Sequence, residues 1–148
     1  MNPNVKLSEK IAVLATLDSA SVAAGTVVSA YVSMANFHQL AALIKTGVMG
    51  ASGTIDAKLR QATDAAGTGV KDIAGKSITQ IVKASGDNKQ ALIEVHGAEL
   101  DVSNGYSFVC LSVTVGTSAS LLDATLIGSV PRFAPASASN QAGVVQIV

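Results

Sequence analysis

Hydrophobic and polar residues alternate most regularly between Tyr106 and Val130. The first half of this stretch alternates aliphatic with small or polar residues, namely Val109, Cys110, Leu111, Ser112, Val113, Thr114 and Val115. A period of two is typical of a β-strand, whose successive side chains point to opposite faces. Gly116-Thr117-Ser118 then separates this run from a second apolar run at residues 121–130. We therefore predict a central β-hairpin with a buried aliphatic face and an unreactive Cys110 thiol.

Similar patterns predict further short strands along the chain. Their expected ranges are residues 11–17, 26–34, 54–61, 77–84 and 90–96. In residues 54–61, Ile55, Ala57 and Leu59 face one way, while Asp56, Lys58 and Arg60 face the other. One face of this strand is therefore expected to be buried, and the charged face to meet solvent or a partner.

Residues 36–46 fit two interpretations. The spacing of Phe37, Leu40 and Ile44 suits a helix that Asn36 would cap and Gly47 would end. The segment nevertheless continues into Gly47-Val48-Met49-Gly50, and the rest of the chain has β-like patterning. We predict a strand here.

Loops and turns are expected between these strands. The Gly-, Ala-, Thr- and Asp-rich residues 63–76 predict a long exposed loop, and residues 85–88 predict a turn. Residues 97–105 form a corner that ends in Asn104-Gly105, a turn signal because both residues tolerate positive φ. Tyr106 follows at once, which gives the corner an immunoglobulin-like character.

Both ends of the chain differ from its middle. Residues 1–10 are polar and contain Pro3, so they predict an N-terminal arm. Residues 131–137 contain two prolines and cannot continue a central strand, because proline donates no ladder hydrogen bond. We therefore predict one domain at residues 11–130 and an extended C-terminal arm at 131–148. This arm, which ends in the aliphatic residues 144–148, is expected to dock on a neighbouring subunit rather than on its own core.

About eight or nine short strands with frequent turns indicate an all-β fold. We expect a single-domain β-sandwich or barrel, of immunoglobulin-like or jelly-roll type, with extended N- and C-terminal arms. Hydrophobic residues form 49% of the 148 residues, but aromatic residues only 3%, and tryptophan is absent. The core must therefore consist of Val, Ile, Leu and Ala.

Composition also argues against several classes of function. Ten basic and ten acidic residues give a formal net charge of zero, whereas nucleic-acid binding needs clustered Lys and Arg. The uncharged residues 19–44 carry too many polar side chains for a membrane span. One cysteine cannot form an internal disulfide. We expect neither nucleic acid nor membrane as a partner.

The sequence contains no complete catalytic or metal-binding pattern. Gly75-Lys76-Ser77 resembles the end of a phosphate-binding loop, but Val70 stands where that pattern needs glycine. His38 and His96 have no second ligand at metal-binding spacing, and Ser52 is not in a nucleophile elbow. The sequence therefore predicts a protein that is not an enzyme and has no metal or cofactor.

Three sequence blocks resemble a group of small tailed-bacteriophage virion proteins of the head-decoration, or capsid-cement, kind. The blocks are QATDAAGTGVKDIAGKSITQI (61–81), ELDVSNGYSFVCLSVTVG (99–116) and PRFAPAS (131–137). Members of the group often carry a basic residue where this chain has Cys110. The resemblance implies a non-enzymatic protein, made in the host cytoplasm, that binds the outer surface of the major capsid protein lattice and stabilises the head. It also implies a homo-oligomer, such as a trimer, on the capsid surface.

Candidate partner-binding residues follow from these patterns and are exposed charges or apolar residues of the arms. They are Lys58, Arg60, Lys71, Asp72, Arg132, Phe133, Val144, Val145, Ile147 and Val148. Two alternatives remain open. One is a head-tail joining or tail-tube subunit, and the other is a β-sandwich module that binds carbohydrate or a host surface.

Overall fold

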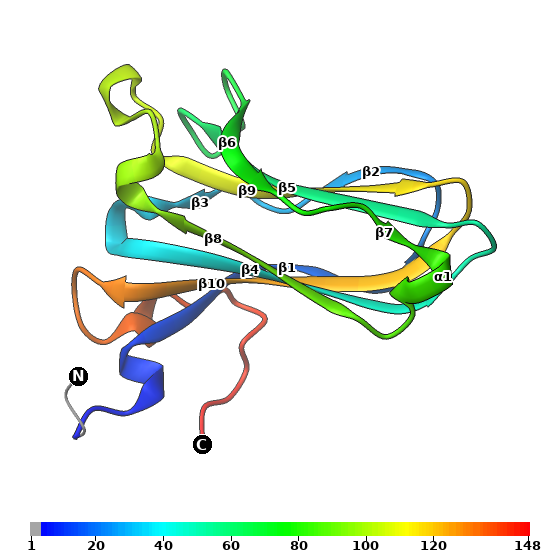
Figure 1. Cartoon of the computed structure of the whole chain (residues 1–148). Helices are drawn as coiled ribbons and strands as arrows, with labels where there is room; N and C mark the ends of the chain where they lie inside the picture. Colours follow the sequence, from blue (N-terminus) through cyan, green and yellow to red (C-terminus); the bar gives the residue numbers. More distant parts are fainter. Residues whose placement is uncertain (1–3) are drawn as a thin grey trace.

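Two antiparallel sheets pack face to face in the computed structural model of the protein, which describes residues 4–148 (Figure 1). The first sheet has the order β1 (Ile11–Val22), β10 (Ser120–Pro131), β4 (Phe37–Met49) and β8 (Gln90–His96). The second has the order β2 (Gly25–Val28), β9 (Phe108–Gly116), β5 (Thr54–Ala62) and β6 (Lys71–Ser77). Two short strands extend the second sheet: β3 (Val32–Ser33) pairs with β9, and β7 (Ile81–Val82) pairs with β5.

Short helices lie between strands, and also before the first strand and after the last strand. They are η1 (Leu7–Glu9), η2 (Met34–Asn36), α1 (Lys83–Gly86), η3 (Gly97–Glu99), η4 (Val102–Asn104) and η5 (Ala136–Ser139). Among the described residues, no helix is long and apolar enough to cross a membrane.

The strand order is that of a jelly roll. Strand pairs are nested along the chain: β1 with β10, β2 with β9, β4 with β8 and β5 with β6. The chain therefore changes sheet at every connection between these eight strands except β5 to β6, as when a long hairpin is rolled up. An immunoglobulin sandwich instead keeps several consecutive strands in one sheet. The all-β sandwich is confirmed, and the barrel and immunoglobulin-like alternatives are wrong.

Several predicted strands are confirmed, including the ambiguous segment 36–46, of which residues 37–46 lie in β4 while Asn36 ends η2. The predicted central hairpin is wrong. Its two strands exist as β9 and β10, but they belong to different sheets, and residues 117–119 carry the chain from one sheet to the other. Thr117 has a φ of 68°, and the Ser118 hydroxyl donates to the Ala51 carbonyl over 2.6 Å. Small and polar residues are typical both of a hairpin turn and of a sharp connection between two sheets, so the sequence does not distinguish the two.

Two further predictions need correction. The expected loop at 63–76 ends at residue 70, because residues 71–77 form β6 along the edge of the second sheet. Gly75 has a φ of 73° and no close neighbour, so this edge strand is irregular. The expected strand at 77–84 is reduced to β7, and α1 follows it directly.

The core lies between the two sheets. Its largest fully buried side chains are Leu40, Ile44, Met49, Ile55, Leu59, Leu111, Leu126, Val95, Val109, Val113 and Val115. Phe37 is also fully buried, but it belongs to a second, smaller cluster with Ala12 and Ala136. The predicted burial of the aliphatic face of β9 is therefore confirmed, as is that of Ile55, Ala57 and Leu59 on β5. Aliphatic side chains are enough to fill the core, because each sheet contributes one continuous apolar face.

Cys110 is also fully buried, although it lies apart from this core cluster. It pairs with Arg60 in the β9–β5 ladder, and its side chain shares a hydrogen bond with Tyr31. Burial raises the pKa of the Cys110 thiol, which keeps it protonated at neutral pH.

We predict that a maleimide leaves Cys110 unlabelled in the native protein and labels it rapidly in urea. The reason is that only the exposed thiolate reacts. Tyr31→Ala serves as a matched variant, because removing the ring should speed native labelling while the protein stays folded. Rapid labelling of the unaltered native protein would contradict this placement.

Candidate interaction surfaces

Three of the predicted partner-binding residues form one charge cluster on the outer face of the second sheet. Lys58 Nζ lies 2.7 Å from one Asp72 carboxylate oxygen, and Arg60 Nε lies 2.9 Å from the other. The strand pairing of Arg60 with Asp72 sets this geometry. Hydrogen bonds from Lys58 and then Arg60 lower the pKa of Asp72. The cluster is half-exposed and its charges pair with one another, so a partner would contact charges that already have partners within the protein.

We predict that charge reversal at both Lys58 and Arg60 lowers the free energy of unfolding by about 1–2 kcal/mol, since exposed pairs contribute only about 0.2–1 kcal/mol each. Urea unfolding measures this loss. Adding Asp72→Lys should recover it by restoring opposite charges. Because the pKa of Asp72 is lowered, its contribution is present above its ordinary pKa of 3.8 and disappears as the pH falls through the lowered value. Equal stability of the double and triple variants would refute the pairing.

Lys71 belongs to a separate cluster at one end of the sandwich. Its ammonium pairs with Asp101 and lies 4.0 Å from the centre of the Tyr106 ring. The Tyr106 hydroxyl donates to the Gly69 carbonyl over 2.9 Å. The Tyr106 hydroxyl is therefore bonded to the loop before β6, and not to the backbone of the nearby corner at residues 97–105. Sequence reasoning missed Asp101, because its link to Lys71 depends on the packing of two distant connections.

The C-terminal segment begins on the protein's own sheet. Ala136 is buried against Ala12 and Phe37. Val13 donates its backbone N–H to the Asn140 side chain and accepts from the Gln141 N–H, both over 2.8 Å. The expectation that the segment docks elsewhere is thus wrong for residues 136–141. Sequence alone did not show that the edge of β1 would be free to receive them.

The last residues are the exposed part of this segment. Val145 is 92% exposed and Ile147 is 55% exposed. The described residues before β1 and the C-terminal residues lie on the outer side of the first sheet (Figure 1). Together with the start of β1 they border an apolar groove of about 550 Å³, lined by Lys6, Leu7, Ser8, Ile11, Val13, Asn140, Val144, Ile147 and Val148. The first three residues of the predicted N-terminal arm lie outside the described part of the chain.

Arg132 and Phe133 lie on the turn between β10 and η5. Phe133 is 74% exposed, and Arg132 is exposed beside it. Phe37 is fully buried, and the other three aromatic residues are half-buried. Phe133 is therefore the one aromatic side chain of residues 4–148 presented to solvent.

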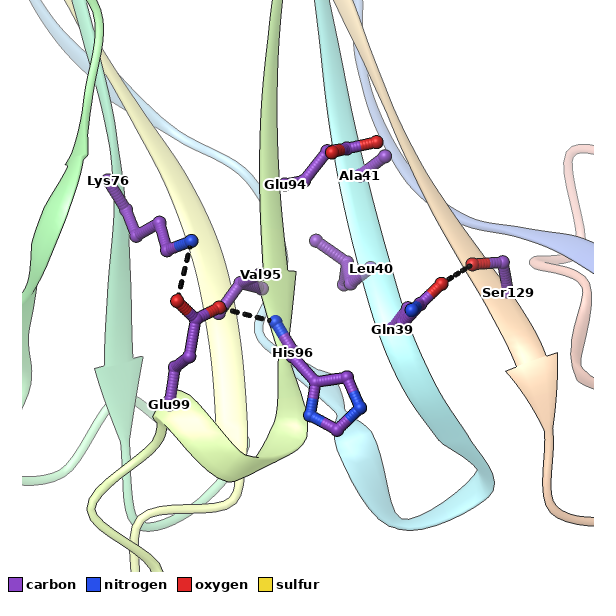
Figure 2. Close-up of a pocket in the computed structure, with 9 residues that line it drawn as sticks. All are labelled: Gln39, Leu40, Ala41, Lys76, Glu94, Val95, His96, Glu99 and Ser129. Carbon is purple, nitrogen blue, oxygen red and sulfur yellow. Dashed lines mark hydrogen bonds and ion pairs between the residues drawn. The ribbon is translucent and has the colours of Figure 1, made fainter.

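A polar pocket of about 220 Å³ lies over the outer face of β4 and β8 (Figure 2). Glu99 accepts the His96 backbone N–H over 2.7 Å and pairs with Lys76 over 2.8 Å. These two interactions, in that order, lower the pKa of Glu99. His96 Nδ1 accepts the Ala98 N–H, so one ring nitrogen is already engaged. These groups serve mainly to hold the η3 corner.

The fold also brings His38 and His96 together, with ring centres 6.4 Å apart. The β4–β8 pairing puts Gln39, the residue after His38, opposite His96, so the sequence spacing of the two histidines gave no sign of their closeness. In the described part of the chain, no three His, Cys, Asp or Glu side chains gather in a way that could hold a metal ion. These features of the protein are interaction surfaces and ion pairs.

Comparison with known proteins gives distant structural similarity alone. No family model and no curated protein matches the chain. A chain of the cowpea mosaic virus empty virus-like particle aligns with a TM-score of 0.46 at 8% identity, covering 90% of this chain and 89% of that one. One from infectious bursal disease virus Gt strain aligns with a TM-score of 0.44 at 9% identity, covering 93% and 37%.

A third similar structure is the CBM22-2 xylan-binding domain of Paenibacillus barcinonensis Xyn10C, with a TM-score of 0.39, 12% identity and coverage of 78% and 90%. Viral capsid proteins and a carbohydrate-binding module thus both appear among the similar structures. Alignments this distant do not bear on what the chain binds or where it assembles.

Proposed function

We propose that the chain is a non-enzymatic virion structural protein of a tailed bacteriophage, which decorates the outer surface of the major capsid protein lattice and stabilises the head. The observation that carries the proposal is the distribution of exposed apolar side chains. Several of the most exposed, Leu7, Phe133, Val145, Ile147 and Val148, lie outside the strands on the segments next to the chain ends. Exposed apolar groups that lie together, as Leu7, Ile147 and Val148 do around the apolar groove, mark interaction sites.

Two further features support this role. The jelly roll is a topology that viral capsid domains use, although lectins and other proteins use it too. The three sequence blocks that resemble head-decoration proteins map to the β5–β7 region, the corner with β9, and the turn after β10. The blocks therefore include the loops and the turn that present charged and aromatic side chains.

The energetics of the C-terminal residues favour attachment at many linked points. Burying Val144, Val145, Ile147 and Val148 contributes on the order of 6–10 kcal/mol. Ordering residues 144–148 costs roughly 5–10 kcal/mol of backbone entropy, so the two effects nearly cancel. Retention then requires backbone pairing with a neighbour's strand or many copies on one lattice. A homo-oligomer, such as a trimer, on the capsid surface would supply such linkage.

The carbohydrate-binding alternative has less support. Such sites commonly stack sugar rings on exposed aromatic side chains. Phe133 lies on a turn beside an arginine, and it does not line the pocket of Figure 2 or the apolar groove. We therefore favour a protein partner.

Quantitative mass spectrometry of purified virions tests the proposal. A decoration protein should be present at hundreds of copies per head, in a fixed ratio to the major capsid protein. Absence from virions would overturn the proposal, and a ring-like count of about a dozen or fewer would favour the head-tail or tail alternative.

A further inference from the structure

The turn of residues 132–135 is held firmly at both ends. Pro131 pairs with Phe37 at the end of the β10–β4 ladder, and Arg132 donates its backbone N–H to the Asn36 carbonyl over 2.8 Å. Beyond the turn, Ala136 is 1% exposed in a cluster with Phe37. The turn thus projects from a fixed base, and little conformational entropy remains to be lost when it binds.

This rigid turn presents an apolar surface. Phe133 is 74% exposed and Val130, just before the turn, is 49% exposed. Val130 has a φ of 51°, a strained conformation that β-branched residues rarely adopt and that clusters at functional sites. Burying a phenylalanine side chain stabilises a protein, yet here the fold directs it to solvent. The arrangement suits a side chain that is buried only when a partner is present.

Arg132 adds a charge requirement to this surface. Its side chain is exposed and forms no ion pair with any carboxylate of residues 4–148. The guanidinium lies beside Gly97, where a Cβ added at Gly97 would come within 3.9 Å of one of its nitrogens. Aromatic residues and arginine are the side chains most enriched at the energetic centres of protein interfaces. An occupant complementary to both would offer an apolar pocket with a carboxylate at its rim.

A second copy of the chain fits this description poorly. The apolar groove beside the chain ends has Lys6 and no carboxylate among its lining residues. The pocket with Glu94 and Glu99 is polar, and Lys76 already pairs with Glu99. A third groove, lined by Ala20, Leu121 and Leu122, has a carboxylate in Asp123, but that carboxylate accepts from the Ser19 hydroxyl over 2.8 Å and lies 3.9 Å from the Lys45 ammonium. None of these three surfaces combines an apolar interior with an unpaired acidic rim, so a different protein is the better occupant.

We infer that Phe133 is the anchor by which the chain docks on the capsid protein, inserting into an apolar pocket while Arg132 pairs with a carboxylate at its rim. This inference rests on the proposed function. It assigns the main contact to a rigid turn of the sandwich, and not to the exposed C-terminal residues.

Binding to empty capsids that lack this protein tests the inference. Phe133→Ala should weaken binding at least about 30-fold, the range of an interface hot spot. Arg132→Glu should weaken it about tenfold or more, with the largest difference from the unaltered protein at low salt. Leu92→Ala and Lys89→Glu are matched controls, because Leu92 is 56% exposed on β8, Lys89 is exposed, and both lie far from the turn in the sequence. Both controls should bind within about twofold of the unaltered protein.

The possible results distinguish failure of the Phe133 anchor from failure of the proposed function. If the unaltered protein binds capsids and Phe133→Ala binds equally well, the anchor is refuted while the proposed function stands. If the unaltered protein does not bind capsids, both are refuted. Sedimentation of the free protein covers the remaining case, since self-association that Phe133→Ala abolishes would make a second copy the occupant and overturn the inference.

Discussion

Leu111→Ala should lower the free energy of unfolding by about 2–5 kcal/mol, the range for removing a fully buried leucine side chain. Leu111 has no exposed surface and belongs to the main core cluster. It lies in β9, which has β2 and β5 as neighbours, so the cavity cannot be closed by a shift of an edge strand. Since small domains are stable by only about 5–15 kcal/mol, the variant would lose a large part of its stability.

Urea unfolding followed by circular dichroism measures this change, and Leu92→Ala is the matched control. Leu92 has the same side chain but is 56% exposed on β8, so its replacement should change stability by less than about 0.5 kcal/mol. Similar losses for the two variants would mean that β9 is not the centre of the core.

Two truncations of the C-terminal segment should differ sharply in stability. Removing residues 142–148 takes away mainly exposed side chains, and we expect a loss below about 1 kcal/mol. Removing residues 136–148 also uncovers Phe37 and breaks both backbone-directed hydrogen bonds to Val13. This longer truncation should cost on the order of 3–5 kcal/mol, from a partly exposed aromatic side chain and two lost hydrogen bonds.

Thermal and urea unfolding of both truncated proteins provide the measurement, and capsid retention of the shorter truncation provides a second. The folded 1–141 protein should be retained less well on capsids, because it lacks the exposed aliphatic residues. Failure of the 1–141 protein to fold would show that residues 142–148 belong to its own core, and equal stability of the two truncations would show that residues 136–141 do not.

Alternation along the chain was enough to predict most strands and their buried faces. Residues 90–96 match β8, and the aliphatic residues of β9 are all buried. These strands could be predicted because one face of each strand meets the core, which requires every second residue to be apolar. The edge strand β6 was missed because only Ile73 of its residues is buried, which leaves no alternation to detect.

The sheet to which each strand belongs could not be predicted in the same way. Residues 117–119 satisfy the composition of a hairpin turn, yet β9 and β10 separate there into two sheets. Only pairing with distant strands decides this, since β10 lies between β1 and β4. The jelly roll and the immunoglobulin fold were therefore equally compatible with the sequence.

Among the candidate interaction residues, exposure could be predicted from the sequence, but contacts between distant segments could not. Exposure of Phe133 was predictable from the prolines on either side of it, which end the sheet. The pairing of Lys58 and Arg60 with Asp72 was not, because the β5–β6 register brings them together. The attachment of residues 140–141 to β1 likewise depends on the free edge of that strand.

A cryo-EM reconstruction of the virion head tests the account most directly. We expect two-sheet jelly-roll density on the outer surface of the capsid lattice, with the turn of residues 132–135 and both chain ends directed at the capsid protein. Density for this chain in the tail or head-tail connector, or a head on which the turn faces solvent, would contradict it.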